Sequence, residues 1–305
     1  MLRILHAADL HLDSPFAALP PELAVQRRKQ QRQLPELLAD LCREHACDLI
    51  LLAGDVFDGA RVCPETVEAM QKAFARGGGP VFISPGNHDP FTAASPWALH
   101  GWPDNVHIFT GGLESLALPE LDCRIWGAGY RSMDCPPLLD DLRAEGNAVG
   151  VFHGDPTQVN SPYNPVSKGQ VAKSGLRYLA LGHVHKDDGF WAGDTLCAWP
   201  GCPMGRGWDE QGVLIVSMDK EIQAKFVALD GPKFFDLTIE GADPAAVLPA
   251  VANEDFYRIT LTGEAERVDL DALQAEFAAF PNLILRDQTT RPLDIWAGAG
   301  EDSFE

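Results

Sequence analysis

The sequence predicts a layered α/β domain followed by a small α+β unit. Two observations support this: short apolar runs alternate with helical stripes over the first 230 residues, and a different pattern follows. Apolar runs of about four to eight residues are typical of buried strands. These runs lie at 2–8, 48–53, 81–84, 148–152 and 178–181, and further short strands are expected at 123–126, 195–199 and 213–218.

Helical stripes separate the early strands. The first stripe repeats at i, i+3, i+4 and i+7 and consists of Leu34, Leu37, Leu38 and Leu41. The second consists of Val67, Met70 and Phe74, and the glycines at 77–79 end it. Because strand and helix alternate in this way, the first part of the chain is predicted to be a layered α/β domain.

Beyond residue 230, polar and apolar residues alternate around 235–239 and 257–261, as in half-buried strands. Asp269 is placed to cap a helix that runs up to Pro281, and a strand is expected at 283–285. We therefore predict a large domain over 1–230, a small α+β domain over 231–296 and an acidic tail over 297–305.

Composition narrows the classes of partner and compartment. The net charge of −20 excludes a generally basic surface, so bound metal ions or a local patch must supply any positive charge at a nucleic-acid site. Seven cysteines without a CxxC pair fit a reducing cytosol, and Cys197 and Cys202 are interpreted as incidental rather than as metal ligands. Asp9 interrupts the short N-terminal apolar run, which does not resemble a signal peptide. No stretch approaches the roughly 20 apolar residues of a membrane span, and we expect a cytoplasmic protein.

One run, over residues 27–32, holds four basic residues and no acidic one. We interpret it as a solvated helix face, with contact to a phosphate backbone as the alternative.

Metal-binding side chains follow five of the predicted strands. In open α/β sheets, ligands bind at the carboxyl ends of the strands. Each motif alone is common in polar loops, but five in succession predict one metal site. The motifs are Asp9-Leu10-His11, Gly54-Asp55-Val56-Phe57-Asp58, Gly86-Asn87-His88-Asp89, His153-Gly154-Asp155 and Gly182-His183-Val184-His185.

The kinds of side chain indicate the class of metal. Imidazoles, carboxylates and one amide oxygen suit Mn, Fe, Zn, Co or Ni. Residues two apart on an extended segment point the same way, and Asp55 in its tight Gly-Asp turn is placed to bridge two ions. Two ions about 3.5–4 Å apart can generate a hydroxide and stabilise both ends of an in-line displacement at phosphorus. The expected ligands are Asp9, His11, Asp55, Asn87, His153, His183 and His185.

These motifs together resemble the signature of the calcineurin-like metallophosphoesterases. More narrowly, the chain resembles the nuclease subunits of the SbcD type over about residues 2–230, and the small second unit resembles that family's capping domain. The resemblance implies a β-sandwich flanked by helices. The stretches that carry the narrower resemblance are "ADLHLD" (8–13), "GDVFD" (54–58), "PGNHD" (85–89), "LALGHVH" (179–185) and "PGCPMGRGWDE" (200–210).

The resemblance also implies how the ligands divide between two ions, which are manganese by analogy, with iron and zinc as the alternatives. One ion would be held by Asp9, His11, Asp55 and His185. The other would be held by Asp55, Asn87, His153 and His183.

His88 and Asp58 are the expected catalytic residues. His88 adjoins Asn87, titrates near neutral pH and is placed to protonate the leaving oxygen or to stabilise charge there. Asp58 follows the bridging Asp55 by three residues and is expected to accept a hydrogen bond from His88 and fix its tautomer. Asp89 is expected to hold the loop.

The function expected from these residues is hydrolysis of phosphodiesters by a DNA repair nuclease, exo- or endonucleolytic, of the SbcD type. Two alternatives stay open: a phosphodiesterase for nucleotides and other small molecules, and a docking subunit with minor hydrolytic activity. The expected partners are DNA, an SbcC-like ATPase and a second copy of the chain, with no membrane. After Trp296 we expect no counterpart of the relatives' C-terminal helix-loop-helix, which grips the ATPase.

Overall fold

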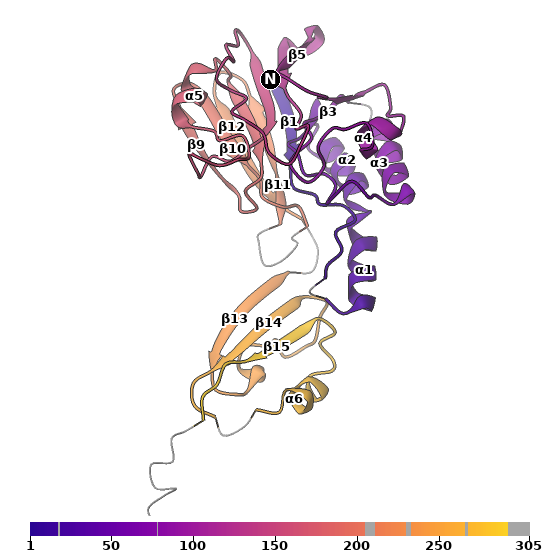
Figure 1. Cartoon of the computed structure of the whole chain (residues 1–305), viewed down its shortest axis with the longest axis vertical. Coiled ribbons are helices and arrows are strands. Elements are labelled where there is room, and N and C mark those ends of the chain that lie inside the picture. The colour runs from indigo at the N-terminus through magenta and orange to yellow at the C-terminus, as the bar shows by residue number, and fades with distance from the viewer. Residues whose placement is uncertain (18, 78, 205–210, 230–232, 266–267, 292–305) are drawn as a thin grey trace, which may run out of the picture. The chain divides into compact units, whose positions relative to one another are not determined.

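The computed structural model describes residues 1–17, 19–77, 79–204, 211–229, 233–265 and 268–291 (Figure 1). The chain divides into two compact units that part after Leu229, and each is described by itself. The acidic tail expected over 297–305 and part of the stretch 200–210 lie outside the described residues. No helix in the described ranges is long and apolar enough to cross a membrane.

Two six-stranded sheets form the first unit (Figure 1). The first sheet runs in the order β12 (Ile222–Ala228), β11 (Gly212–Met218), β1 (Leu2–Ala7), β2 (Leu49–Leu52), β3 (Val81–Ile83) and β4 (Val106–Ile108). The second runs in the order β5 (Glu114–Leu118), β6 (Cys123–Gly127), β7 (Ala148–His153), β8 (Tyr178–Gly182), β10 (Thr195–Trp199) and β9 (Asp188–Ala192). Strands β1 to β4 are parallel, as are β6, β7, β8 and β10. The carboxyl ends of the central strands therefore gather at one edge of each sheet.

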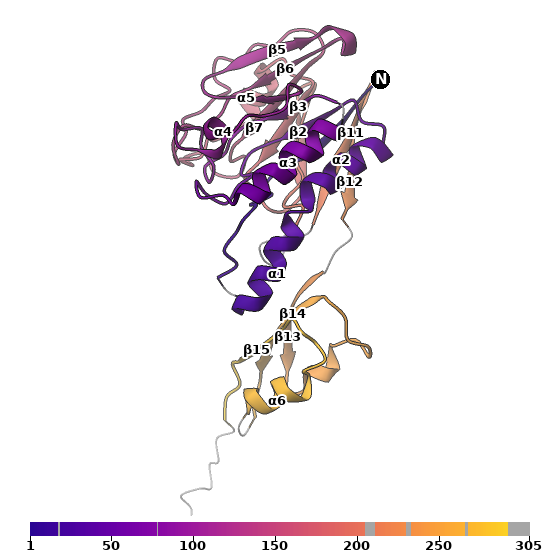
Figure 2. The same ribbon diagram turned by 90° about the vertical axis from the view of Figure 1, so that its right-hand side faces the viewer.

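Helices cover the outer faces of these sheets, and Figure 2 shows α2 and α3 side by side over the first sheet. A short 3₁₀ turn spans Pro119–Leu121. The helices of this unit are α1 (Pro21–Gln31), α2 (Leu34–Glu44), α3 (Pro64–Gly77), α4 (Pro96–Leu99) and α5 (Lys168–Lys173).

Successive side chains of β1 point to opposite faces of the first sheet and pack against different layers. Leu5 packs in one cluster with Leu38 of α2 and Phe74 of α3. Its neighbour Ile4 points to the other face and packs with Val149 of the second sheet. Each such fully buried side chain contributes about 1.5–3 kcal/mol. A further cluster lies on the outer face of the second sheet beneath α5. The predicted α/β sandwich flanked by helices is confirmed.

The basic run at 27–32 covers the end of α1 and its C-cap Arg32, and its interpretation as a solvated face is wrong in part. Arg27 is buried on the helix face that also carries Gln31. Gln31 donates from Nε2 to the carbonyl oxygen of His11 at 3.0 Å. Arg32 donates to Asp13 at 3.3 Å. This helix thus anchors the segment that carries His11, and its basic residues are partly used inside the protein.

The second unit is a three-stranded parallel sheet with one helix. The strands are β13 (Phe234–Glu240), β14 (Phe256–Thr262) and β15 (Leu283–Asp287), and a 3₁₀ turn spans Pro244–Ala246. Asp269 caps α6 (Leu270–Glu276) by accepting from the amide of Ala272 at 3.0 Å, as predicted. The helix ends at Glu276 rather than at Pro281, because the chain turns there and brings Phe280 against the ring of Tyr257.

Candidate metal centre

All the predicted site residues lie at the carboxyl ends of five strands. Asp9 and His11 follow β1, Asp55 and Asp58 follow β2, and Asn87 and His88 follow β3. The second sheet contributes His153, the last residue of β7, and His183 and His185 after β8. The two sheets therefore present their side chains to one place, where the contacts below join them.

The backbone at this place is unusual. Asp9, His11, Asp55 and His183 all have positive φ angles, of 53°, 45°, 49° and 97°. Such conformations cost of the order of 1–3 kcal/mol each and cluster at functional sites. The expectation that Asp9 and His11 point the same way on an extended segment is wrong in its reason. Their side chains converge because the backbone turns. The backbone amides of Asp9 and His11 hold that turn by donating hydrogen bonds to the carbonyl oxygens of Gly54 and Asp55.

The first group of atoms that could bind a metal lies around His11. Its Nε2 lies 3.2 Å from Nε2 of His185. The same nitrogen of His185 lies 4.0 Å from Oδ1 of Asp9. Asp9, His11 and Asp55 each offer a donor atom, and these atoms lie within 4.8 Å of one another. The amide of His183 donates to both oxygens of Asp9, at 3.1 and 3.0 Å, and so orients the carboxylate.

The second group forms around His153, which is fully buried. Its Nε2 lies 2.9 Å from Oδ1 of Asn87 and 3.3 Å from Oδ2 of Asp55. The ring of His183 stands edge-on to that of His153, with centroids 5.2 Å apart. Gly54 makes this approach sterically feasible: its φ is +90°, and a Cβ there would come within 2.4 Å of the His153 ring.

His88 and Asp58 lie together beside these groups. Nδ1 of His88 is 3.4 Å from Oδ1 of Asp58, and its backbone amide donates to Asp55 at 2.8 Å. The same oxygen of Asp58 lies 3.0 Å from Nδ1 of His11. Asp58 therefore faces two imidazoles, of which sequence reasoning expected only His88. The His88 side chain is 36% exposed and so can meet a substrate.

Asp89 holds the loop, as the sequence predicted. One carboxylate oxygen accepts from the amide of Gly86 at 2.7 Å. The other accepts from the amides of Val56 and Phe57, at 2.8 and 3.0 Å. These buried hydrogen bonds join the loop after β3 to the loop that carries Asp55.

Asp89→Ala should destabilise the protein by at least about 3 kcal/mol, because it leaves three buried amides without acceptors at about 1–3 kcal/mol each. Asp89→Asn keeps an acceptor oxygen and should cost less. Urea unfolding of the two variants beside the wild type measures the difference. An unchanged midpoint for Asp89→Ala would show that the loop is held by other contacts.

Burial and the neighbouring charges displace the pKa values of the buried groups of the site. Burial raises the pKa of Asp9 to about 7, although the charge of His153 opposes this. Burial lowers the pKa of His153, but the charge and hydrogen bond of Asp55, the charge of Asp9 and the hydrogen bond to Ala53 together outweigh it, and the pKa rises to about 9. Burial, with the charge of His153, lowers the pKa of His183 to about 4. The buried carboxylates thus favour a positive charge on His153, at a place where a metal ion can supply that charge instead.

The donor set fits divalent metal ions of the kind predicted. It combines carboxylates, imidazoles and one amide oxygen, which suit borderline first-row metals. The 3.2 Å between the ring nitrogens of His11 and His185 is the spacing of two ligands that each stand about 2.1 Å from one ion. Donor atoms of His11, Asp58 and His88 also lie within 4.8 Å of one another. Asp58 faces Nδ1 of both rings, which is the arrangement of a shared hydrogen-bond acceptor.

Cys202, interpreted from the sequence as incidental, lies beside the first group. Its sulfur and donor nitrogens of His11 and His185 lie within 4.8 Å of one another. The available signal was its position: Cys202 follows β10, which is parallel to and pairs with β8, so it emerges at the same strand ends as His185.

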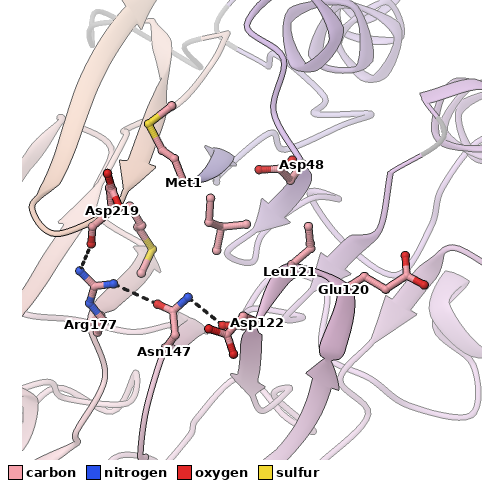
Figure 3. A pocket seen from close by; sticks show the side chains of 10 residues that line it. Met1, Asp48, Glu120, Leu121, Asp122, Asn147, Arg177 and Asp219 are labelled. Carbon is pink, nitrogen blue, oxygen red and sulfur yellow. Dashed lines mark hydrogen bonds between the residues drawn. The ribbon is translucent and has the colours of Figure 1, made fainter.

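A pocket of about 450 Å³ lies at the opposite ends of the strands (Figure 3). Met1 precedes β1, Asp48 precedes β2 and Arg177 precedes β8. Arg177 donates to Asn147, which in turn donates to the carbonyl oxygen of Asp122. These bonds link the strand starts, and none of the predicted site residues lines this pocket.

Known proteins resemble this chain over the part that carries the predicted site residues. Residues 2–187 match the profile of the calcineurin-like phosphoesterase family. The metallophosphoesterase YhaO of Bacillus subtilis is 33% identical over 69% of this chain and 55% of its own length. The SbcD component of the SbcCD nuclease of Bacillus subtilis is 25% identical over 69% of this chain and 64% of its own length. The chain therefore spans less than two thirds of either relative. An archaeal phosphodiesterase of known structure is 15% identical, with a TM-score of 0.43 over 74% of this chain and all of its own.

Proposed function

Because this chain belongs to the calcineurin-like phosphoesterase family, we propose that it is a metal-dependent phosphodiesterase whose substrate is DNA. The observation that carries the proposal is the convergence of carboxylates, imidazoles and one amide at adjoining strand ends, beside the exposed ring of His88.

The proposed site holds two divalent ions, with manganese first and iron or zinc as alternatives. Ions in such a pair act as Lewis acids on phosphoryl oxygens and lower the pKa of a water nucleophile. Asp55 lies 3.3 Å from Nε2 of His153 and within 4.8 Å of ligand atoms of Asp9 and His11, which supports a bridging role. The residues that would hold the first ion are Asp9, His11, Asp55 and His185, and those for the second are Asp55, Asn87, His153 and His183.

His88 and Asp58, which are not among the proposed metal ligands, would transfer a proton to the leaving group. His88 would carry a proton on the exposed side of its ring and deliver it to the leaving oxygen. Asp58, 3.4 Å from Nδ1 of His88, would fix the tautomer that leaves the other nitrogen directed at substrate. His153 is fully buried, and its Nδ1 is hydrogen-bonded to the carbonyl oxygen of Ala53. It would therefore bind the second metal ion rather than transfer a proton.

The similarity to the SbcD component of the SbcCD nuclease supports DNA as the substrate. By the same analogy we propose a role in DNA repair in the cytoplasm, an SbcC-like ATPase or a second copy of the chain as partner, and a capping role for the second unit. The net charge of −20 favours a different substrate, a nucleotide or other small phosphodiester, because it repels a polyanion outside the metal site.

A digestion panel separates these substrates. With Mn²⁺ we expect cleavage of single- or double-stranded DNA, loss of that cleavage with a chelator, and recovery when Mn²⁺ returns. Bis-p-nitrophenyl phosphate and mononucleotides belong in the same panel. If small esters are cleaved while DNA of either form stays intact, the nuclease assignment fails and the small-molecule assignment replaces it.

A further inference from the structure

A buried thiol lies beside the imidazoles of the first proposed metal position. Cys202 is fully buried. Its sulfur and one nitrogen each of His11 and His185 lie within 4.8 Å of one another. Two ligands of one ion are separated by at most the sum of their bond lengths, about 4.4 Å for a sulfur at 2.3 Å and a nitrogen at 2.1 Å. Around a tetrahedral ion the same bond lengths place sulfur and nitrogen about 3.6 Å apart, so a side-chain movement of about 1 Å brings all three onto one ion.

The surroundings of Cys202 differ from those of a thiol that serves as core packing. Buried cysteines ordinarily behave as small apolar residues. Cys42, Cys123 and Cys197 do so, since each belongs to an apolar cluster of the first unit. The apolar clusters formed by the described residues include neither Cys135 nor Cys202, and of these two thiols Cys202 is the one whose sulfur lies beside imidazole nitrogens.

The backbone before Cys202 is built for close approach to His185. Gly201 has a φ of +73°, and a Cβ there would come within 2.5 Å of the His185 carbonyl oxygen. The amide of Cys202 donates to that same oxygen at 3.4 Å. Any other residue at 201 would push the two segments apart, so glycine keeps the sulfur beside the imidazole.

We propose that Cys202 is a sulfur ligand of the metal position formed by His11 and His185. The inference rests on the proposed function, because it adds a ligand to the first of the two ions. Sulfur ligands favour zinc, iron(II) and cobalt(II) over manganese and magnesium. The second position, with oxygen and nitrogen donors alone, keeps the preference for manganese. The two positions therefore differ in metal selectivity.

Cobalt(II) tests the ligand directly, because a sulfur–cobalt bond gives a charge-transfer absorption in the near ultraviolet. One equivalent of Co²⁺ added to the metal-free full chain should produce this band. Cys202→Ala should remove the band and weaken Co²⁺ binding by about 10-fold or more, as expected for loss of a metal contact. Cys197→Ala deletes another fully buried thiol, from the core beneath α5, and should keep both.

X-ray absorption at the zinc edge supplies a second measurement that needs no variant. Wild-type protein loaded with one equivalent of Zn²⁺ should show a sulfur scatterer at about 2.3 Å. Bound metal without a sulfur scatterer, or a cobalt band that survives in Cys202→Ala, overturns the proposal. These outcomes are separate from the proposed function: DNA cleavage with no sulfur–metal bond refutes the ligand alone, and a sulfur–metal bond without DNA cleavage refutes the substrate alone.

Discussion

Asp55→Asn is expected to abolish phosphodiester hydrolysis and to reduce the bound metal from two ions per chain to one or none. Asp55 lies 3.3 Å from His153, and its donor atom also lies among those of Asp9 and His11, so both groups lose their shared carboxylate. An amide of the same shape keeps one acceptor oxygen but neither the charge nor the second anionic oxygen. Turnover should fall by about 10³-fold or more, the upper range for removing one group that stabilises the transition state.

Asp122→Asn is the matched control. It makes the same substitution at an exposed residue of the pocket in Figure 3, at the opposite ends of the strands. Its φ of 45° suits asparagine as well as aspartate. Metal content by elemental analysis and turnover on bis-p-nitrophenyl phosphate should match the wild type. An Asp55→Asn protein that keeps two ions and most of its turnover would contradict the bridging role.

His88→Ala is expected to lose about 10²- to 10⁴-fold in turnover on DNA, the usual contribution of a general acid or base. It should keep both metal ions, because His88 is not among the proposed ligands. The loss should be smaller on bis-p-nitrophenyl phosphate, whose leaving group departs without a proton. The ratio of the two losses therefore measures proton transfer rather than general damage.

Two further variants serve as comparisons for His88→Ala. Asn87→Ala, one residue away, should instead weaken the second metal, because Asn87 contacts Nε2 of His153 at 2.9 Å. His45→Ala removes an imidazole that lies before β2, at the far ends of the strands, and should leave both rates unchanged. Equal losses on the two substrates for His88→Ala would mean that His88 binds substrate or metal and does not protonate the leaving group.

The sequence predicted the strands and the placement of the site well, because both depend on local pattern. Runs such as 81–84 are apolar over their length, and the residue that follows a parallel strand lies at the sheet edge whatever the rest of the fold. The loop role of Asp89 was likewise predictable, since it adjoins a turn. The metal-binding and catalytic roles of the predicted residues stay predictions.

What the sequence could not supply depends on contacts between distant segments. Arg27 lies in a run of basic residues, and only the packing of α1 shows that it is buried. The positive φ angles of Asp9 and His11 are held by hydrogen bonds from their backbone amides to the carbonyl oxygens of Gly54 and Asp55, far along the chain. Cys202 has no CxxC neighbour, and the pairing of β10 with β8 alone brings it to His185.

The central claim is that two divalent ions lie at the joined strand ends. An anomalous-difference map of crystals grown with Mn²⁺ in large excess, which also fills a position that prefers other metals, tests it most directly. We predict two peaks about 3.5–4 Å apart, one beside Asp9, His11 and His185 and the other beside Asn87, His153 and His183, with Asp55 between them. A single peak there, or peaks only at the acidic pocket of Figure 3, would contradict it.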